Sequence, residues 1–255
     1  MKTQIQNSKI MNTLLKSFGL FAMLFVMTFT TSCDRKGNDT PVIEMTISEE
    51  DAVDVIEGAL TMDTEGLVSE LEDAAEVADK YAEKTFNEPC GVTFDSTFTV
   101  VESNAFITAS YSNHLEWTVY CNNAEIPVNL DFSRESQGTY ETTRMESADA
   151  SSSAWNLDNL ILGTNYVLNG TYSRSGSQTS KVRNENSLTS TIQMTITNLN
   201  VNKGTRRIES GTADLTISGT STTGHSFSFD AEVIFQGNGA AVVVVNGNSY
   251  QIDLY

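Results

Sequence analysis

The stretch Leu115–Cys121 reads Leu-Glu-Trp-Thr-Val-Tyr-Cys and alternates between apolar and more polar side chains. Successive side chains of a β-strand point to opposite faces of a sheet, so this period of two predicts a strand with one buried face and one wet face. The same pattern occurs on both sides, with these apolar residues in phase: Val92, Phe94, Phe98 and Val100; Ile107, Ala109 and Tyr111; Ile126, Val128, Leu130 and Phe132. Neighbouring strands of this kind predict an antiparallel sheet.

Towards the C-terminus the alternation continues in pairs of segments joined by short polar links. The predicted strands are Thr164–Arg174, Ser187–Asn198, Ile208–Ser218, Ser226–Gln236, Ala240–Val245 and Ser249–Leu254. The last two flank Asn246-Gly247, a dipeptide that suits the positive φ angles of a tight hairpin turn. Residues 89–255 are therefore predicted to form an antiparallel β-meander of roughly ten to twelve strands. A curved sheet, a sandwich and a barrel-like closure all fit this pattern.

The middle of the β region has a weaker pattern. Residues Thr139–Met145 are compatible with a polar edge strand. Glu146–Ser153 is rich in Ser, Ala and Asp, a composition that predicts a loop or a mobile flap.

Before the β region, residues 47–88 have helical periodicity. Ser48 and Asp51 have the spacing of a capping box. The second helix is expected to begin near Asp63 or Thr64 and to end before Pro89. Both helices have one apolar stripe and an acidic opposite face, which predicts an acidic helical hairpin that lies on another surface. The fold class is thus α+β, mainly β, with the hairpin preceding the sheet.

The first 32 residues resemble an export signal in their composition. Lys2, Lys9 and Lys16 precede the apolar stretch Phe18–Thr30, and no acidic residue does. A helix of those 13 residues would span roughly 20 Å, which is too short for a hydrocarbon core of about 30 Å. We therefore expect residues 1–32 to be a secretory signal peptide. Residues 33–46, which are charged and aperiodic, are expected to be a tether.

The end of this leader, Thr30-Thr31-Ser32-Cys33, resembles the lipobox of bacterial lipoproteins in the looser form of the Bacteroidota. The polar run Asp34–Asp39 resembles the tether and surface-export signal of that group. The resemblance implies that Cys33 is lipidated and anchors the protein to the outer membrane, facing the periplasm or the cell surface. The whole chain is similar to uncharacterised flavobacterial lipoproteins, which implies no activity. The alternative is an ordinary signal peptide with a chance cysteine.

Two further cysteines, Cys90 and Cys121, are predicted to form a disulfide. An exported protein meets an oxidising compartment, which permits the pair. Cys90 has the parity of Val92, and Cys121 that of Trp117, so both thiols are expected on the core side of the sheet. Two free buried thiols are the alternative.

The net charge of the chain is −18, and it becomes −21 without the three lysines of the leader. The acids are concentrated in residues 34–89, which hold 17 acidic and 4 basic residues. A field of this sign repels phosphate backbones, so nucleic acid is not an expected partner. Solvation of a secreted protein explains the charge, and cations or basic partners are the alternative.

No catalytic constellation is apparent. The sequence lacks a His-Glu-x-x-His, a Gly-x-Ser-x-Gly and a phosphate-binding glycine motif, and its two histidines have no ligand spacing. We therefore expect no metal and no cofactor. Trp155, predicted beside a loop, is a candidate for stacking on a sugar ring. Arg206 and Arg207 are a candidate contact for an anion or an acidic lipid. The plain alternatives are a core tryptophan and a hairpin tip.

Three functions follow as hypotheses. The first is a non-catalytic binding module that is anchored to the membrane by lipid and recognises an envelope protein, glycan or lipid. The second is a carrier of an apolar ligand inside a curved sheet. The third is an enzyme that acts on envelope glycans or peptides, motivated by carboxylates that the sequence does not place and by Trp155.

Overall fold

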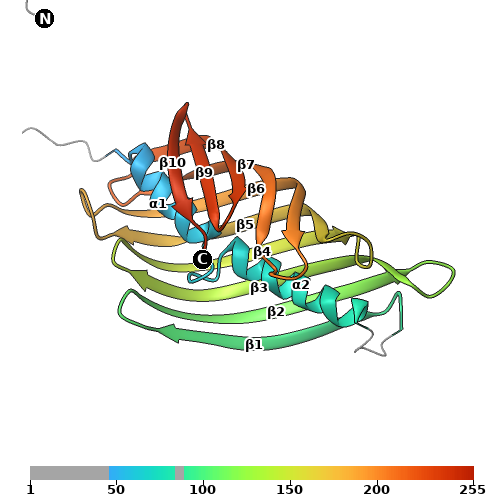
Figure 1. Cartoon of the computed structure of the whole chain (residues 1–255). Helices are drawn as coiled ribbons and strands as arrows, with labels where there is room; N and C mark the ends of the chain where they lie inside the picture. The colour runs from blue at the N-terminus through green and yellow to red at the C-terminus, as the bar shows by residue number, and fades with distance from the viewer. Residues whose placement is uncertain (1–45, 84–88) are drawn as a thin grey trace, which may run out of the picture. The chain divides into compact units, whose positions relative to one another are not determined.

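The computed structural model describes residues 46–83 and 89–255, and these form one compact unit (Figure 1). The described part contains one sheet of ten antiparallel strands in the order β1 to β10, each beside its neighbour in the chain. The sheet is open, with β1 and β10 at its edges. The strands are β1 (Thr93–Ser103), β2 (Ile107–Cys121), β3 (Pro127–Thr142), β4 (Met145–Asp158), β5 (Asn165–Ser180), β6 (Ser187–Asn202), β7 (Ile208–Ser221), β8 (Ser226–Gly237), β9 (Ala240–Val245) and β10 (Asn248–Asp253).

This architecture confirms the predicted fold class: mainly β, an antiparallel meander, with two helices before it. Of the three forms left open by the sequence, the structure has the open curved sheet. The hairpin turn between β9 and β10 is at Asn246 and Gly247, with φ angles of 48° and 85°, as that dipeptide predicts.

The helical segment consists of α1 (Glu49–Leu60) and α2 (Leu67–Ala82). Figure 1 shows the two helices following one another along the sheet and not lying side by side, so they do not form the predicted antiparallel hairpin. The predicted capping box is present, because the Asp51 amide donates to Ser48 Oγ at 3.2 Å and the Ser48 amide donates to Asp51 Oδ2 at 3.2 Å. The second helix begins at Leu67 and not at Asp63 or Thr64. Thr64 belongs to the connecting turn, where its hydroxyl donates to the Gly58 carbonyl at 2.7 Å.

Both helices lie on the same side of the sheet (Figure 1). The β10 edge also contacts α1 and the residues after it, because the Met62 amide donates to the Leu254 carbonyl at 3.0 Å. The side-chain amides of Asn246 and Asn248 donate to the Glu49 carboxylate at 2.7 and 2.8 Å. Since β5 contacts α1 from the other side, the sheet curls around this helix.

The core lies between the helices and the inner face of the sheet. Residues of the predicted parity, such as Leu130, Phe132 and Leu168, are at most 2% exposed. The outer face carries mainly Thr, Ser, Asn and acidic side chains, and most of these are exposed. No helix among the described residues has the length and apolar character needed to cross a bilayer.

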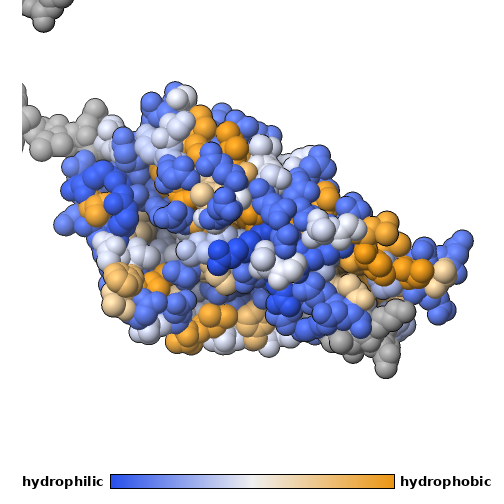
Figure 2. Space-filling model, in the orientation of Figure 1, coloured by the Kyte–Doolittle hydropathy of each residue, from blue (hydrophilic) through white to orange (hydrophobic). Residues whose placement is uncertain are grey.

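Some large apolar side chains remain exposed at one end of the sheet. Ile126 and Val128 near the β2–β3 turn are 44% and 43% exposed, and Leu162 in the β4–β5 connection is 73% exposed. Figure 2 shows hydrophobic surface at the right-hand end of the view, where the β4–β5 connection lies in Figure 1.

The disulfide joins Cys90 to Cys121, with the Cα atoms 5.7 Å apart. Only Cys121 packs against the core, while Cys90 is exposed in the turn before β1. The expectation that both sulfur atoms are on the core side was wrong for Cys90, because the strand begins only at Thr93 and the parity argument does not apply before it.

The prediction for residues 139–153 was wrong. Thr139–Thr142 are in β3 and Met145–Ser153 are in β4, and both strands are well inside the sheet. Glu146–Ser153, predicted as a loop, pair along their length with both β3 and β5. The prediction failed because the inward side chains of this stretch are polar, as in a loop. In the structure they form hydrogen bonds and ion pairs with other parts of the protein.

Candidate functional site

A polar layer is buried between the helices and the middle strands of the sheet. Its sheet side consists of inward residues of β2 to β6 that are at most 8% exposed: Asn113, Arg134, Ser136, Ser147, Asp149, Ser151, Ser153, Arg174, Gln178 and Ser190. A charged group this deep is stable only when it is paired and hydrogen-bonded. Two arginines provide most of that pairing.

Arg174 connects β5 to three other parts of the chain. Its Nε donates to Asp149 Oδ1 at 2.9 Å, and its Nη2 donates to the Tyr111 hydroxyl at 2.6 Å. On the helical side, Nη1 donates to the Gly58 carbonyl at 2.7 Å and Nη2 to the Thr64 carbonyl at 2.9 Å. Arg174 thus holds the end of α1 and the α1–α2 link against the sheet.

Arg134 does the same for α2 and is fully buried. Its Nη1 donates to Asp73 Oδ2 at 2.7 Å, and its Nη2 donates to Glu65 and, at 2.9 Å, to Asn113 Oδ1. The carboxylates come from the helical segment, whose acidic residues the sequence placed on a solvated face. Part of that acidic character instead pairs with the sheet.

Glu70 on α2 is also completely buried in this layer. Ser151 Oγ donates to its Oε1 at 3.1 Å, and Ser153 and Trp155 lie beside the same carboxyl group. Burial raises the pKa of Glu70, and the nearby Arg134 charge only partly opposes this. The neutral carboxylic acid is therefore favoured here more than in an exposed glutamate.

A second ionic group fixes the first turns of α1. Arg183 Nε, from the β5–β6 turn, donates to Asp51 Oδ1 at 2.9 Å. Arg144 Nη2, from the β3–β4 turn, donates to Asp54 Oδ1 at 2.7 Å, and Arg183 also pairs with Asp54. These contacts leave Asp54 neutralised by two guanidinium groups.

Beside Arg144 the surface opens into a groove of about 290 Å³. We name it the end groove. It is lined by residues 54–64 of α1 and the α1–α2 link, 106–107 where the β1–β2 turn meets β2, 140–145 around the β3–β4 turn, and 253–255 at the end of β10 and just after it. Four separate segments therefore converge on it. Its walls combine apolar and aromatic side chains with carboxylates, a combination that is typical of ligand pockets.

Three carboxylates line the end groove without a partner among the described residues. Glu57, Asp63 and Asp253 make no hydrogen bond or ion pair there. Burial, and next the carboxylate of Asp54, raise the pKa of Glu57, while Arg144 opposes the rise and Asp253 adds to it. The groove thus carries negative charge that this part of the protein does not balance.

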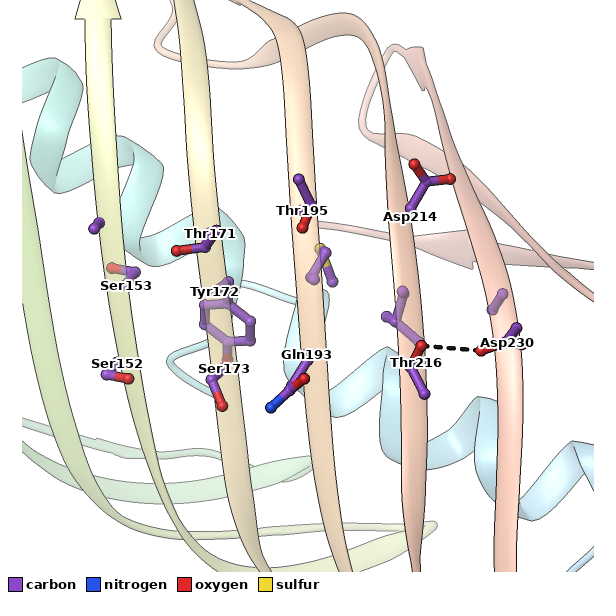
Figure 3. A pocket seen from close by; sticks show the side chains of 14 residues that line it. Ser152, Ser153, Thr171, Tyr172, Ser173, Gln193, Thr195, Asp214, Thr216 and Asp230 are labelled. Atoms are coloured by element: carbon purple, nitrogen blue, oxygen red, sulfur yellow. Dashed lines mark hydrogen bonds between the residues drawn. The ribbon is translucent and has the colours of Figure 1, made fainter.

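The outer face of the sheet has a larger and more open hollow of about 650 Å³ (Figure 3). The labelled side chains Ser152, Thr171, Gln193 and Thr195 lie on adjacent strands, and the Thr216 hydroxyl donates to Asp230 Oδ1 at 2.9 Å. Similar hydroxyl and carboxyl groups repeat over the rest of this face. Nothing distinguishes this hollow chemically from its surroundings.

The residues singled out from the sequence do not come together in one site. Trp155 is inside β4 and only 2% exposed, so its predicted place beside a loop was wrong. Arg206 Nε donates to Asp79 Oδ2 at 2.8 Å, and Arg207 stacks on Tyr255 with its guanidinium carbon 4.5 Å from the ring centre. Both arginines thus have partners within the protein. Cys33 lies outside the described residues.

The described residues contain no group of His, Cys, Asp and Glu side chains arranged to hold a metal ion. His114 lies on the outer face of β2, with its Nε2 3.8 Å from Asp95 Oδ2. What the geometry offers is a rigid, internally paired scaffold and one half-enclosed groove with unpaired carboxylates.

No protein-family model, curated protein or solved structure matches this chain. The function must therefore be inferred from the chain's own residues.

Proposed function

We propose that this protein is a lipid-anchored component of the bacterial cell envelope and that its folded part is a non-catalytic binding module whose ligand enters the end groove. The groove is the observation that carries the binding proposal: about 290 Å³, walls from four segments, and carboxylates that lack internal partners among the described residues. The lipobox-like residues before Cys33 support the anchor. The Cys90–Cys121 disulfide agrees with an oxidising compartment.

A carrier with an interior lipid site is less well supported. The side of the sheet that would enclose a lipid is occupied by α1 and α2. The small enclosed space beside Tyr140 and Arg174 is about 10 Å³, which has room for about one water molecule. The enzyme hypothesis loses one of its two motivations, because Trp155 is buried in the core.

The anchor predicts a clear change on substitution of Cys33. In a bacterial host fed radiolabelled palmitate, the Cys33→Ser variant should carry no label and should move from the membrane fraction to the soluble fraction. The physical reason is that each buried CH₂ of an acyl chain contributes about 0.8 kcal/mol to membrane binding. A Cys90→Ser/Cys121→Ser variant is the matched control and should keep the label. Unchanged label in Cys33→Ser would rule out this anchor.

The groove predicts where ligands bind. Residues 34–255, labelled with ¹⁵N, would be titrated with a panel of amino acids, aliphatic polyamines, oligosaccharides and a medium-chain fatty acid. We expect saturable amide shifts to centre on Phe106, Met145 and Asp253, which surround the groove. A Thr143→Trp variant fills the groove from the β3–β4 turn and should abolish these shifts.

The matched control is Thr222→Trp, which places the same side chain in the exposed β7–β8 turn, away from the groove. Shifts centred instead on the outer-face hollow, at Thr195 and Thr216, would show that the groove is not the binding site. Conversion of a probe by the pure protein would contradict the non-catalytic assignment.

A further inference from the structure

The end groove differs from the other polar parts of the protein in its charge balance. In the buried layer, each arginine has carboxylate partners within hydrogen-bond distance. Among the described residues that line the groove, Arg144 is the only basic one, and its guanidinium pairs with Asp54 at 2.7 Å. Glu57, Asp63 and Asp253 remain without a cationic partner at such a distance among the described residues. Three carboxylates therefore line the groove, Glu57 half-buried and Asp63 and Asp253 exposed, and their charge repels anions.

The environment of Glu57 shows that this imbalance has an energetic cost. Its carboxyl is half-buried on α1, and the charges of Asp54 and Asp253 act on it at the same time. Burial is the main reason why the pKa of Glu57 is raised; the like charges of Asp54 and Asp253 raise it further, and Arg144 opposes the rise. A cation in the groove would remove this cost and gain the attraction of all three carboxylates.

The carboxylates are not arranged for a single metal ion. The described residues include no cluster of three or more metal-ligating side chains, so these acids are too far apart to share one ion. A dispersed set of carboxylates around a groove suits a larger organic cation, or several charges along one molecule.

The remaining lining is apolar and partly aromatic. Phe106, in the β1–β2 turn, is 76% exposed, and Ile107, Met145 and Leu254 continue the apolar surface inward. The turn is ordered by Asn104, whose Oδ1 accepts from the amides of Phe106 at 2.8 Å and Ile107 at 3.0 Å. An exposed ring held at the mouth of an acidic groove can cover an aliphatic stem and attract its cationic end.

We infer that the end groove recognises an ammonium or guanidinium group carried on an apolar stem, with Phe106 covering the stem and Glu57 and Asp253 receiving the charge. This inference rests on the proposed function, since it names the ligand class of the same groove. The cation can be a free aliphatic amine or the side chain of a lysine or arginine in a partner protein. These two sources share the recognition chemistry, and the test below separates them.

The test measures binding by isothermal titration calorimetry to residues 34–255. The cationic probes are 1,6-diaminohexane and the peptide acetyl-Phe-Lys-Phe-amide, and the neutral counterpart is acetyl-Phe-norleucine-Phe-amide. We expect a cationic probe to bind at least about tenfold more tightly than the neutral peptide and to weaken as salt is added. Binding of the diamine alone indicates a free amine, and binding of the lysine peptide alone indicates a protein side chain.

The decisive variant is Glu57→Gln/Asp253→Asn, which should lose at least about tenfold in affinity for the cation and little for the neutral peptide. Removal of repelling charges should not unfold it, and circular dichroism would confirm the fold. The matched control, Asp214→Asn/Asp230→Asn, makes the same charge change at the outer-face hollow and should bind as the original protein does.

Equal binding of cationic and neutral probes, or an unchanged affinity in the Glu57→Gln/Asp253→Asn variant, would overturn the inference. If the neutral peptide still binds and Thr143→Trp blocks it, the groove remains the binding site and only the ligand class is wrong. If no probe of either experiment binds in the groove, the proposed function fails as well.

Discussion

Replacement of Arg174 by methionine is expected to lower the free energy of unfolding by about 3–5 kcal/mol, because it leaves the buried carboxylate of Asp149 without its charged partner. Arg174 also donates to the Gly58 and Thr64 carbonyls and to the Tyr111 hydroxyl, so the variant frees several buried acceptors at once. Urea unfolding followed by tryptophan fluorescence and circular dichroism would measure the change. We expect the helices to separate from the sheet at lower denaturant concentration.

Two controls test this explanation. Lys181→Met removes an ion pair to Glu141 that is 30% and 61% exposed at its two ends, and it should cost at most about 1 kcal/mol. The double variant Arg174→Met/Asp149→Leu removes both charges and should recover part of the loss, because no unpaired charge stays buried. A loss below about 1 kcal/mol for Arg174→Met would mean that this pairing does not hold the layers together.

Removal of the disulfide in the variant Cys90→Ser/Cys121→Ser should destabilise the protein by roughly 3–4 kcal/mol on the chain-entropy model. The two cysteines are 31 positions apart, and the closed loop contains β1 and most of β2. Since β1 is an edge strand with a mostly exposed or half-exposed surface, it has few other constraints. The measurement is the unfolding midpoint in urea, with the original protein under reducing agent as a second reading of the same loss.

The outcome against this prediction is a midpoint that neither reduction nor substitution changes. In the same samples, mass spectrometry would show the original protein two daltons below its reduced form. Hydrogen exchange should locate the effect in β1 and the end of β2, since β4 to β7 pair without any help from the loop.

Much of the fold was predictable because most inward positions follow the simple alternation of apolar and polar residues. The region around Leu115–Cys121, the capping box at Ser48 and the turn at Asn246-Gly247 each act through contacts that are close in the sequence. Local rules of this kind act before any tertiary partner is present, so a single sequence displays them.

The part that could not be predicted is the part where tertiary partners replace apolar burial. In β4, the inward residues Ser147, Asp149, Ser151 and Ser153 look like a loop by composition. Their partners include Arg174 on β5 and Glu70 on α2, and no short window of sequence contains both members of a pair. Arg134 and Arg174 were missed for the same reason, although each is an arginine at an inward parity.

The end groove was equally hidden from the sequence. Its acids come from α1, the α1–α2 link and the last residue of β10, and its exposed aromatic side chain, Phe106, comes from the β1–β2 turn. Conversely, Arg206 and Arg207 were interpreted as an anion site because their partners are distant in the sequence. Folding brings Asp79 to Arg206 and Tyr255 to Arg207. A charged residue that has no oppositely charged neighbour in the sequence can therefore have a partner in the folded protein.

The neighbour-only strand order has a consequence for how the molecule assembles. Every ladder of the sheet connects consecutive strands, so the sheet requires only short loops to close. The helices, which come first in the chain, are held by partners far downstream. The Gly58 carbonyl accepts a hydrogen bond from Arg174, 116 positions later, and the Glu49 carboxylate accepts one from Asn248, 199 positions later. Docking of the helices therefore closes the longest loops in the molecule, and a chain that stops before β10 leaves Glu49 and Met62 without the contacts that complete the fold.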